Sequence, residues 1–508
     1  MAPRRTYALL ALLAIASLAC NRQAAPTAAP FATATATAPP TPTSIWDDRA
    51  VFRAGLIPEE QKALSQLPGA SVYHLDVQIA DDLASLTGQQ RVRYTNQEQQ
   101  ALDAVYFQLF ANMWGGECSV SALQVDGQDV QPLYEDGRST LRVPLSAPLQ
   151  PGQRAEIEMD FQVEVPTELA GNYGLFGYLD GILVLDGFYP AIPAYDAQGW
   201  HAGRVPPSAD TTFQDASFYL VRVTAPASVT LIASGIQVER TWEGDLQAVT
   251  FAAGPARDFY LAASERLVRS SETAGATTVN SYAFEERSEA SRSALRTAMR
   301  AIQSFSARFG AYPYSEFDVV STPMQGALGI EYPGIVGINY TAYDPTATLS
   351  GLPAPVILES TLAHEVAHQW FYNVVGNDQH NQPWLDEAVV QYVTGLYFLD
   401  AYGPQGLEGF RDSWLVRWER VGRAAIPVGL PAGDYQGKEY GAIVYGRGPL
   451  FIEALAQKMG QAAFDAFLRE YYQAHQWGIA TAASFQQLAQ EHCGCDLQPL
   501  FDEWVNPR

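Results

Sequence analysis

His364, Glu365 and His368 form a His-Glu-x-x-His run, and Glu387 follows after a gap of eighteen residues. On a helix the two histidines would be four positions apart, so both imidazoles leave one face and can bind a single tetrahedral metal ion. Glu387 is the natural third ligand, because a His₂Glu set leaves a fourth position open for water or substrate. Structural zinc sites are closed. The spacing therefore predicts a catalytic Zn²⁺ site made by His364, His368 and Glu387.

The surrounding sequence fits the helices that such a site needs. Val356 to Val374 is apolar at helical spacing without an internal Gly or Pro, and Pro383 precedes a second helical pattern that carries Glu387 near its start. Glu365 lies one residue further round the helix, where it can hold the attacking water and accept its proton. The competing interpretation is a solvated helix with chance His and Glu, but 7 His in 508 residues make such a run rare.

The first twenty residues predict a bacterial secretion signal. Arg4 and Arg5 precede an apolar run from Tyr7 to Ala19, which is shorter than the roughly twenty residues of a membrane-spanning helix. Ser17-Leu18-Ala19-Cys20 resembles a lipoprotein cleavage box, whose cysteine becomes the lipidated first residue of the mature chain. The alternative is ordinary cleavage with Cys20 discarded. We therefore expect an extracytoplasmic protein that a lipid anchors to the cell membrane.

Composition divides the rest of the chain into three parts. Residues 21–44 are mostly Ala, Thr and Pro, which cannot bury a core and predict a linker. From 73 to 263, short alternating runs between turn residues are typical of an antiparallel β-sandwich. A helical stretch from Ser288, a plausible N-cap, to Phe309 follows, and the chain after Pro355 is nearly all helical in pattern. We expect an N-terminal β domain over 45–270 and a mostly helical α+β domain over 271–508.

Net charge limits the class of binding partner, and the number of cysteines limits the possible disulfides and metal sites. The formal net charge is -24, with 55 acidic against 31 basic residues, so phosphate backbones would be repelled and nucleic acid is not an expected partner. Besides Cys20 the chain holds Cys118, Cys493 and Cys495, an odd number for disulfides. Cys493-Gly494-Cys495 lacks a second cysteine pair, so it is a weak metal signal and is interpreted as a bland or redox-labile turn.

Two further motifs accompany the metal motif. In Leu328-Gly329-Ile330-Glu331-Tyr332-Pro333, Glu331 lies 33 positions before His364, and Tyr445-Gly446-Arg447-Gly448 follows Glu387. Taken with Trp384-Leu385-Asp386-Glu387, they resemble the aminopeptidase N family of thermolysin-like zinc peptidases. The first is similar to the family's Gly-x-Met-Glu-Asn motif, whose glutamate binds the free α-amine of the substrate. The second is similar to its Tyr-x-Lys-Gly segment, whose tyrosine stabilises the tetrahedral intermediate.

The resemblance spans roughly residues 66 to 505 and implies an N-terminal β-sandwich or saddle domain before a thermolysin-like catalytic domain. It implies a zinc aminopeptidase that acts on peptides with a free N-terminus through one Zn²⁺. The implied catalytic residues are Glu365 and Tyr445, and the implied substrate-binding residues are Glu331 and Gly329. Because the resemblance ends with the catalytic domain, we expect a short form without the family's helical C-terminal domain.

Several positions depart from the family pattern and leave alternatives open. Leu328, Ile330 and Tyr332 stand where the exopeptidase motif has Gly, Met and Asn. A zinc endopeptidase or narrow-specificity hydrolase would be favoured if Tyr332 and Leu328 closed the amine pocket. A non-enzymatic lipoprotein that binds peptide or glycan is the alternative from another class. The remaining departures are Asp386 and Ala388 for Asn and Gly, and Arg447 for Lys.

Three side chains have a structural interpretation beside the functional one. Glu331 lies in an apolar stretch, where either a substrate ammonium or a buried arginine would balance its charge. Tyr445 could be a packed aromatic, and Tyr440 is the neighbouring candidate for its role. Gln391 follows Glu387 by four residues, so it either bonds a zinc-ligand histidine or is a surface glutamine.

Overall fold

The computed structural model describes residues 45–169, 172–206 and 211–506. The expected signal at 1–20 with Cys20 and the linker at 21–44 lie outside these ranges. None of the helices described in this part of the chain has the length and apolar character needed to cross a bilayer.

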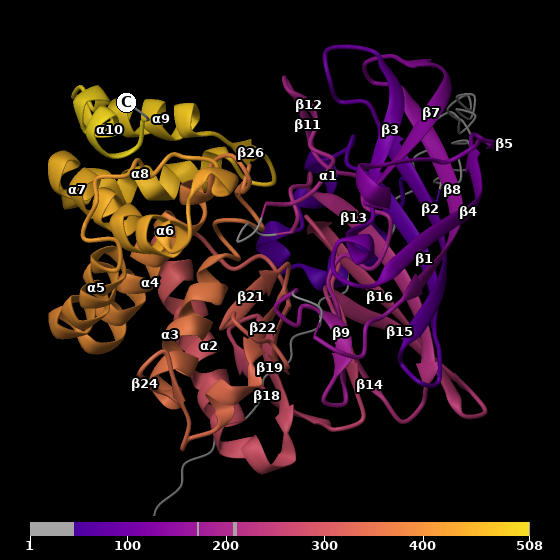
Figure 1. Cartoon of the computed structure of the whole chain (residues 1–508), viewed down its shortest axis with the longest axis horizontal. Helices are drawn as coiled ribbons and strands as arrows, with labels where there is room; N and C mark the ends of the chain where they lie inside the picture. The colour runs from indigo at the N-terminus through magenta and orange to yellow at the C-terminus, as the bar shows by residue number, and fades with distance from the viewer. Residues whose placement is uncertain (1–44, 170–171, 207–210, 507–508) are drawn as a thin grey trace, which may run out of the picture. The chain divides into compact units, whose positions relative to one another are not determined.

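The first half of the described region is built from β-sheets, with the largest on the right of Figure 1. That sheet has the order β15 (Ile236–Glu243), β16 (Leu246–Ala256), β13 (Ser217–Pro226), β1 (Val72–Ile79), β2 (Ser85–Thr95), β8 (Arg154–Glu164), β4 (Glu117–Val125) and β5 (Gln128–Asp129). A second sheet has the order β14 (Thr230–Ala233), β17 (Leu261–Ser264), β10 (Ile182–Leu185) and β9 (Phe176–Leu179). The smaller sheets are β3 (Leu102–Gln108), β7 (Thr140–Leu149) and β6 (Leu133–Glu135), and the hairpin β11 (Tyr195–Asp196) with β12 (Gly199–Trp200).

Alternation of buried and exposed side chains explains why these segments form half-buried strands. Along β8, Ala155, Ile157, Met159, Phe161 and Val163 are buried and the residues between them are more exposed. They join one apolar core with side chains from the other sheets of this half. The expected β architecture is confirmed, but the largest sheet is not wholly antiparallel because β1 pairs with β13 in parallel.

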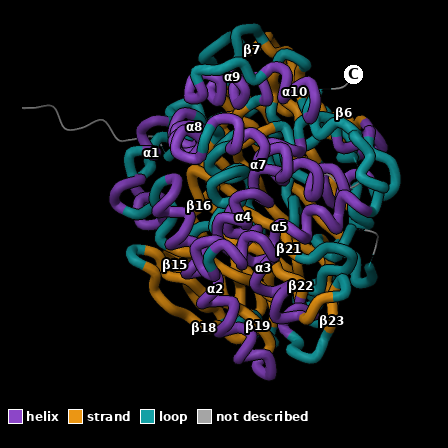
Figure 2. The backbone as a smooth tube through the Cα atoms, turned by 90° about the vertical axis from the view of Figure 1, so that its left-hand side faces the viewer, coloured by secondary structure: helices purple, strands orange, loops and turns teal. Residues whose placement is uncertain are grey.

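A mixed five-stranded sheet begins the second half. Its order is β18 (Leu267–Ala274), β19 (Thr277–Phe284), β20 (Glu316–Thr322), β22 (Ile335–Asn339) and β21 (Gly329–Tyr332). Helices α2 (Ser288–Phe309) and α3 (Ala354–Ala367) lie over this sheet (Figure 2). The apolar side chains of α2 recur every three or four residues, which buries one face of the helix. Ser288 is the first helical residue, and Arg287 rather than Ser288 stands at the N-cap.

Helices make up most of the remaining chain. They are α4 (Glu387–Tyr402), α5 (Pro404–Glu419), α6 (Glu439–Ala442), the π-helical turn η9 (Ile443–Arg447), α7 (Gly448–Met459), α8 (Gln461–Ala474), α9 (Ala482–Cys493) and α10 (Gln498–Trp504). The short strands β25 (Gly376–Asn377) and β26 (Ile479–Ala480) pair in parallel, and the short strands β23 (Thr348–Leu349) and β24 (Leu352–Pro353) precede α3. The turns before and between the early elements are η1 (Ala50–Gly55), η2 (Pro58–Glu60), α1 (Ala63–Gln66), η3 (Phe110–Asn112), η4 (Asp136–Arg138), η5 (Glu285–Arg287) and η6 (Tyr340–Tyr343), and the later ones are η7 (Pro383–Leu385) and η8 (Ala432–Asp434).

The helix expected over 356–374 is shorter than its apolar pattern. The α3 helix ends at Ala367, and His368 is its C-cap. Beyond it the chain turns and Phe371 forms a bridge with Val375. The residues after His368 keep an apolar pattern because side chains such as Trp370 are buried in the same core, not because the helix continues.

Arg257 joins the two halves of the molecule. The residue is 2% exposed, and its guanidinium donates to the carbonyl oxygens of Gln214, Tyr372, Val374 and Gly478 at 2.6 to 3.2 Å. Gln214 belongs to the β half and the other three acceptors belong to the helical half. The same guanidinium also requires glycine in β25, because a Cβ on Gly376 would lie 2.2 Å from the Arg257 Cζ.

Candidate metal centre

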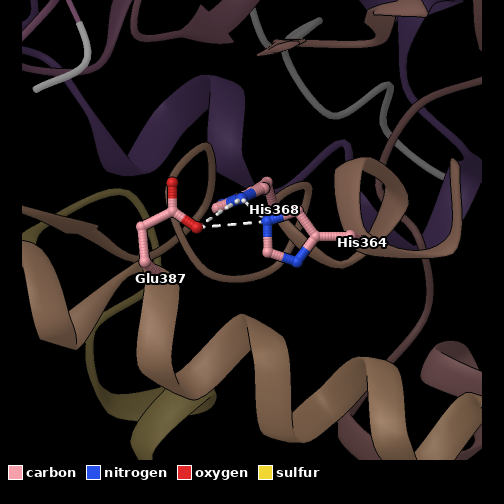
Figure 3. A group of neighbouring side chains, drawn as sticks. All are labelled: His364, His368 and Glu387. Carbon is pink, nitrogen blue, oxygen red and sulfur yellow. Dashed lines mark hydrogen bonds and ion pairs between the residues drawn. The ribbon is translucent and has the colours of Figure 1, made fainter. Parts of the chain in front are cut away.

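His364, His368 and Glu387 converge on one point between α3 and α4. The two imidazole planes are nearly perpendicular, and their Nε2 atoms are 3.2 Å apart. Glu387 opens α4, and its Oε2 lies 3.1 Å from Nε2 of His364 and 3.7 Å from Nε2 of His368. Figure 3 shows this carboxylate oxygen directed at both rings. All three side chains are buried, so the two helices hold the three donor atoms away from bulk solvent.

The donor set fits a zinc ion. Ligands bonded to one tetrahedral Zn²⁺ at about 2.0–2.1 Å lie about 3.3 Å from one another, close to the separations of these three atoms. Burial lowers the pKa of His364, which favours the neutral imidazole that metals require. Burial alone would raise the pKa of Glu387, but the hydrogen bond with His364 and the neighbouring imidazoles bring it below its ordinary value. Burial also lowers the pKa of His368, but the carboxylates of Glu331 and Asp386 outweigh it and raise this pKa well above its ordinary value. Zinc binding at His368 would therefore displace a proton from the imidazole.

The outer nitrogens of both histidines are also contacted. Nδ1 of His368 lies 2.7 Å from Oδ1 of Asp386 and 3.2 Å from the carbonyl oxygen of Phe371. Nδ1 of His364 lies 3.5 Å from the Thr394 hydroxyl, which donates to a backbone carbonyl and so presents its lone pairs to the ring. Such contacts keep the proton on Nδ1 and leave Nε2 free for a metal.

Gln391 lies in the same group of outer contacts. Its amide nitrogen lies 3.4 Å from Nδ1 of His364, and the residue is 4% exposed. Turning the amide would bring Oε1, which has no other partner among the described residues, to accept from a protonated Nδ1. The interpretation of Gln391 as a surface residue is therefore wrong. The helix α4 is buried on most of its sides along 388–397, so a polar side chain there faces either the site or the core.

Glu365, Glu331 and Gly329 form the wall beside the ligands. Glu365 is 4% exposed, and burial raises its pKa to about 8, although the nearby His368 opposes the shift. Glu331, on the edge strand β21, hydrogen-bonds with Glu365, and its Oε1 lies 3.7 Å from Nδ1 of His368. A Cβ on Gly329 would lie 2.3 Å from Oε1 of Glu365. Only glycine therefore lets β21 approach this carboxylate so closely.

Tyr445 contacts the third candidate ligand. Its hydroxyl donates to Oε1 of Glu387, and its ring lies 6.1 Å from the His364 ring. It sits in the π-helical turn η9, a distortion that often occurs at functional sites. Tyr440 is buried, and its ring lies 5.9 Å from the ring of Tyr445. The hydroxyl of Tyr445 therefore contacts a candidate metal ligand directly, whereas the ring of Tyr440 packs behind Tyr445.

Tyr332 does not lie over Glu331. Side chains alternate along a strand, so neighbouring residues of β21 face opposite sides. The ring of Tyr332 is 2% exposed and stacks on Tyr260 with centroids 4.1 Å apart. It packs in a small core made with strands of the β half. The sequence-based concern that Tyr332 closes the amine pocket is therefore not supported by its position.

Sequence reasoning missed two of the outer contacts. The motif comparison marks Asp386 only as a replacement for asparagine, although its position immediately before Glu387 would allow a role beside the ligands. The only sequence feature that points to a role for Thr394 is its spacing of seven residues from Glu387, which places both side chains on one face of the helix. The cysteines also differ from expectation, because Cys493 and Cys495 are joined in a disulfide and Cys118 is a buried free thiol.

Comparison with known proteins shows similarity to one peptidase family and to several aminopeptidases. Residues 293–504 match the family described as the peptidase family M1 domain. Aminopeptidase 2 of Candida albicans is 22% identical over 408 residues, which cover 77% of this chain and 42% of that protein. Aminopeptidase N of Canis lupus familiaris is 23% identical over 416 residues, with the same two coverages of 77% and 42%. The chain thus spans about two fifths of the length of these curated relatives.

A solved structure shares the fold. The M1 zinc metallopeptidase from Deinococcus radiodurans matches with a TM-score of 0.63 and 21% identity, over 86% of this chain and 93% of that one. At this identity the likeness establishes the fold alone. It agrees with the expected arrangement of an N-terminal multi-sheet β region followed by a largely helical region.

Proposed function

Because the chain belongs to peptidase family M1, the aminopeptidase N family, we propose that it is a zinc-dependent aminopeptidase that removes N-terminal residues from peptides. The observation that carries this proposal is the convergence of His364, His368 and Glu387 on one point with Glu365 and Tyr445 beside them. A binding protein would have no need for a buried acid and a phenol at a metal site.

The chemistry follows from the residues around the ligands. His364, His368 and Glu387 would hold the zinc ion, which would supply a Lewis acid that acidifies water and polarises a carbonyl group. Glu365 accepts the proton of the attacking water and passes it to the leaving amine. Burial raises its pKa to about 8, which suits a group that takes up and releases a proton near neutral pH.

Two other residues complete the proposed reaction. The Tyr445 hydroxyl, which already meets an anionic oxygen of Glu387, donates to the oxyanion that develops on the substrate. Glu331 receives the α-ammonium of the substrate, because a buried carboxylate is stabilised by an opposite charge. Gly329 supports this arrangement by letting the strand that carries Glu331 pack directly on Glu365.

The proposal is tested by measuring zinc content and by comparing aminoacyl chromogenic substrates with their N-acetylated forms. We expect bound zinc, turnover of the free-amine substrates and little turnover of the blocked ones. Equal cleavage of both would identify an endopeptidase on the same fold. Zinc without any hydrolysis of peptides would favour a binding protein.

A variant sharpens this test at Glu331. A charge-assisted hydrogen bond in a partly dry site contributes roughly 1.5 to 3 kcal/mol, which is about ten- to two-hundredfold in kcat/KM. Glu331→Ala should therefore lose most activity on free-amine substrates and change little on N-acetylated ones. If both substrate types lose activity equally, Glu331 supports Glu365 rather than the substrate amine.

We also propose that the protein is exported and lipid-anchored through Cys20, with residues 21–44 as the linker. The support is the sequence alone: two arginines, a short apolar run and a small-residue segment before the cysteine. A peptidase tethered in this way would act on peptides outside the cytoplasm.

A further inference from the structure

A second group of possible metal ligands lies away from His364, His368 and Glu387. Asp196 ends β11, His201 directly follows β12, and Asp378 follows β25 in the helical half. One ligand atom from each lies within 4.8 Å of the others. Nε2 of His201 is 2.8 Å from Oδ2 of Asp196, and its Nδ1 is 3.9 Å from Oδ2 of Asp378. The group therefore gathers one imidazole and two carboxylates from both halves of the molecule.

Each member of the group is held in place by its surroundings. Oδ1 of Asp196 accepts from the backbone N–H of Gln198, and in its hydrogen-bonding orientation the Gln198 amide donates to both carboxylate oxygens at 2.8 Å. Oδ2 also lies beside His201. Oδ1 of Asp378 accepts from two backbone N–H groups of its own turn, and Oδ2 accepts from the Asn381 amide. The His201 ring packs edge-on against Phe213 with centroids 4.8 Å apart. Little side-chain entropy remains to be lost when a ligand binds.

Two buried polar atoms at this site lack hydrogen-bond partners among the described residues. Nε2 of His201 is buried, and although Asp196 is close, its oxygen is not placed to accept a hydrogen bond from that nitrogen. Gln214, which is 3% exposed, has a buried Oε1 without a partner. Both residues line one cavity of about 80 Å³, which has room for more than one water molecule and reaches the group through His201, since neither aspartate lines it. Unpaired polar atoms around such a cavity indicate an occupant that supplies bonds to them.

We propose that Asp196, His201 and Asp378 bind a second divalent cation of the zinc class. An imidazole nitrogen with two carboxylate oxygens is a donor set that suits zinc, and water from the cavity would complete the four-coordinate shell. One such water would donate to Oε1 of Gln214. The ion would also balance the charge of two carboxylates that lie within 4 Å of the same imidazole.

The site would brace the segment that leads into the first metal centre. Asp378 comes from the loop before α4, and the next residue, Gln379, donates to Oδ2 of Asp386 at 2.9 Å. Asp386 in turn pairs with His368. A cation bound by Asp378 would therefore fix the β11–β12 hairpin to the same loop that positions Asp386. Its role is structural, and it is independent of whether peptides are hydrolysed.

Metal stoichiometry tests this site with the first centre as an internal reference. Chelator-treated protein is saturated with Zn²⁺, freed of excess metal by gel filtration, and measured by elemental mass spectrometry. We expect two zinc ions per wild-type chain, one for His201→Ala, one for His364→Ala, and none for the double variant. His492→Ala serves as a matched control, because His492 also pairs with a carboxylate, Glu470, but lies on α9. It should retain two.

Thermal unfolding provides the second measurement. Added Zn²⁺ should raise the Tm of His364→Ala protein, whose first centre is disabled, and this shift should vanish in the double variant. One zinc per wild-type chain, or two in His201→Ala, would overturn the proposal and leave an ordinary Asp–His–Asp ion-pair group. If His201→Ala does not fold, Asp196→Asn replaces it. Its side chain is 38% exposed, so the substitution perturbs the core little while it removes one anionic ligand, and we expect the variant to retain one zinc ion.

Discussion

Replacing Tyr445 with phenylalanine removes one hydroxyl from the metal centre and leaves the ring packing intact. In the structure this hydroxyl donates to Oε1 of Glu387, so it already has an anionic acceptor before any substrate binds. Removing a donor to a transition-state oxyanion typically costs about 10²- to 10³-fold in kcat. Because the hydroxyl must give up its hydrogen bond to Glu387 in order to donate to the oxyanion, it stabilises the transition state less than a donor without a prior partner would. We therefore expect Tyr445→Phe to lower kcat by about 10²-fold, with little change in KM.

The assay must separate two roles that this geometry allows. The kcat of the wild type, Tyr445→Phe and Tyr440→Phe is measured on one chromogenic substrate, with zinc content determined on the same samples. Tyr440→Phe is the control, since its buried ring neighbours that of Tyr445. If added Zn²⁺ restores Tyr445→Phe to wild-type kcat, the hydroxyl acts only by holding Glu387 and the oxyanion role is refuted. A silent Tyr445→Phe beside an impaired Tyr440→Phe would mean that the wrong tyrosine is assigned.

The remaining predictions concern a base, a buried acid and the membrane anchor. Glu365→Gln should reduce turnover by roughly 10²- to 10⁴-fold at unchanged zinc content, and lost zinc would instead make Glu365 a ligand. Burial, reinforced by the neighbouring Asp258, raises the pKa of Asp186 to about 7, so the folded state holds an extra proton between about pH 4 and pH 7. The stability from that proton is present below about pH 4 and lost as pH rises through 7, so urea unfolding of Asp186→Asn should depend less on pH over this range. Identical pH dependence in wild type and variant would contradict it. Cys20→Ser should move the protein from the detergent-extracted membrane fraction to the soluble or precursor pool, whereas unchanged fractionation without an acyl mass would leave a plain exported protein.

The metal ligands could be predicted from sequence because their geometry is local. Two histidines four positions apart on a helix meet on one face whatever the rest of the fold does, and Glu387 lies close along the chain. The end of α3 could not be predicted, since Trp370 and the apolar residues after it are buried by other elements and extend the periodic pattern beyond the helix. Burial and helical continuation leave the same signature in a sequence.

Long-range pairing is the other part that sequence could not supply. The parallel pairing of β1 with β13 joins segments more than a hundred residues apart, and strand patterns carry no record of the partner. The burial of Gln391 could not be predicted for a related reason. Its exposure depends on which other elements cover α4. Because α4 is covered on most sides, its sequence shows no polar face that would reveal which side chains are exposed.

The position of Arg257 bears on how the molecule unfolds. Its guanidinium belongs to the β half, yet three of its four carbonyl acceptors belong to the helical half. Separating the halves would break three of the four hydrogen bonds that this charged donor makes, and a hydrogen bond to a charged group contributes about 1.5–3 kcal/mol. Loss of structure in either half alone would forfeit these bonds, so they couple the stability of the two halves. Calorimetry should accordingly record one cooperative transition for residues 45–506, and limited proteolysis should not release a stable helical fragment.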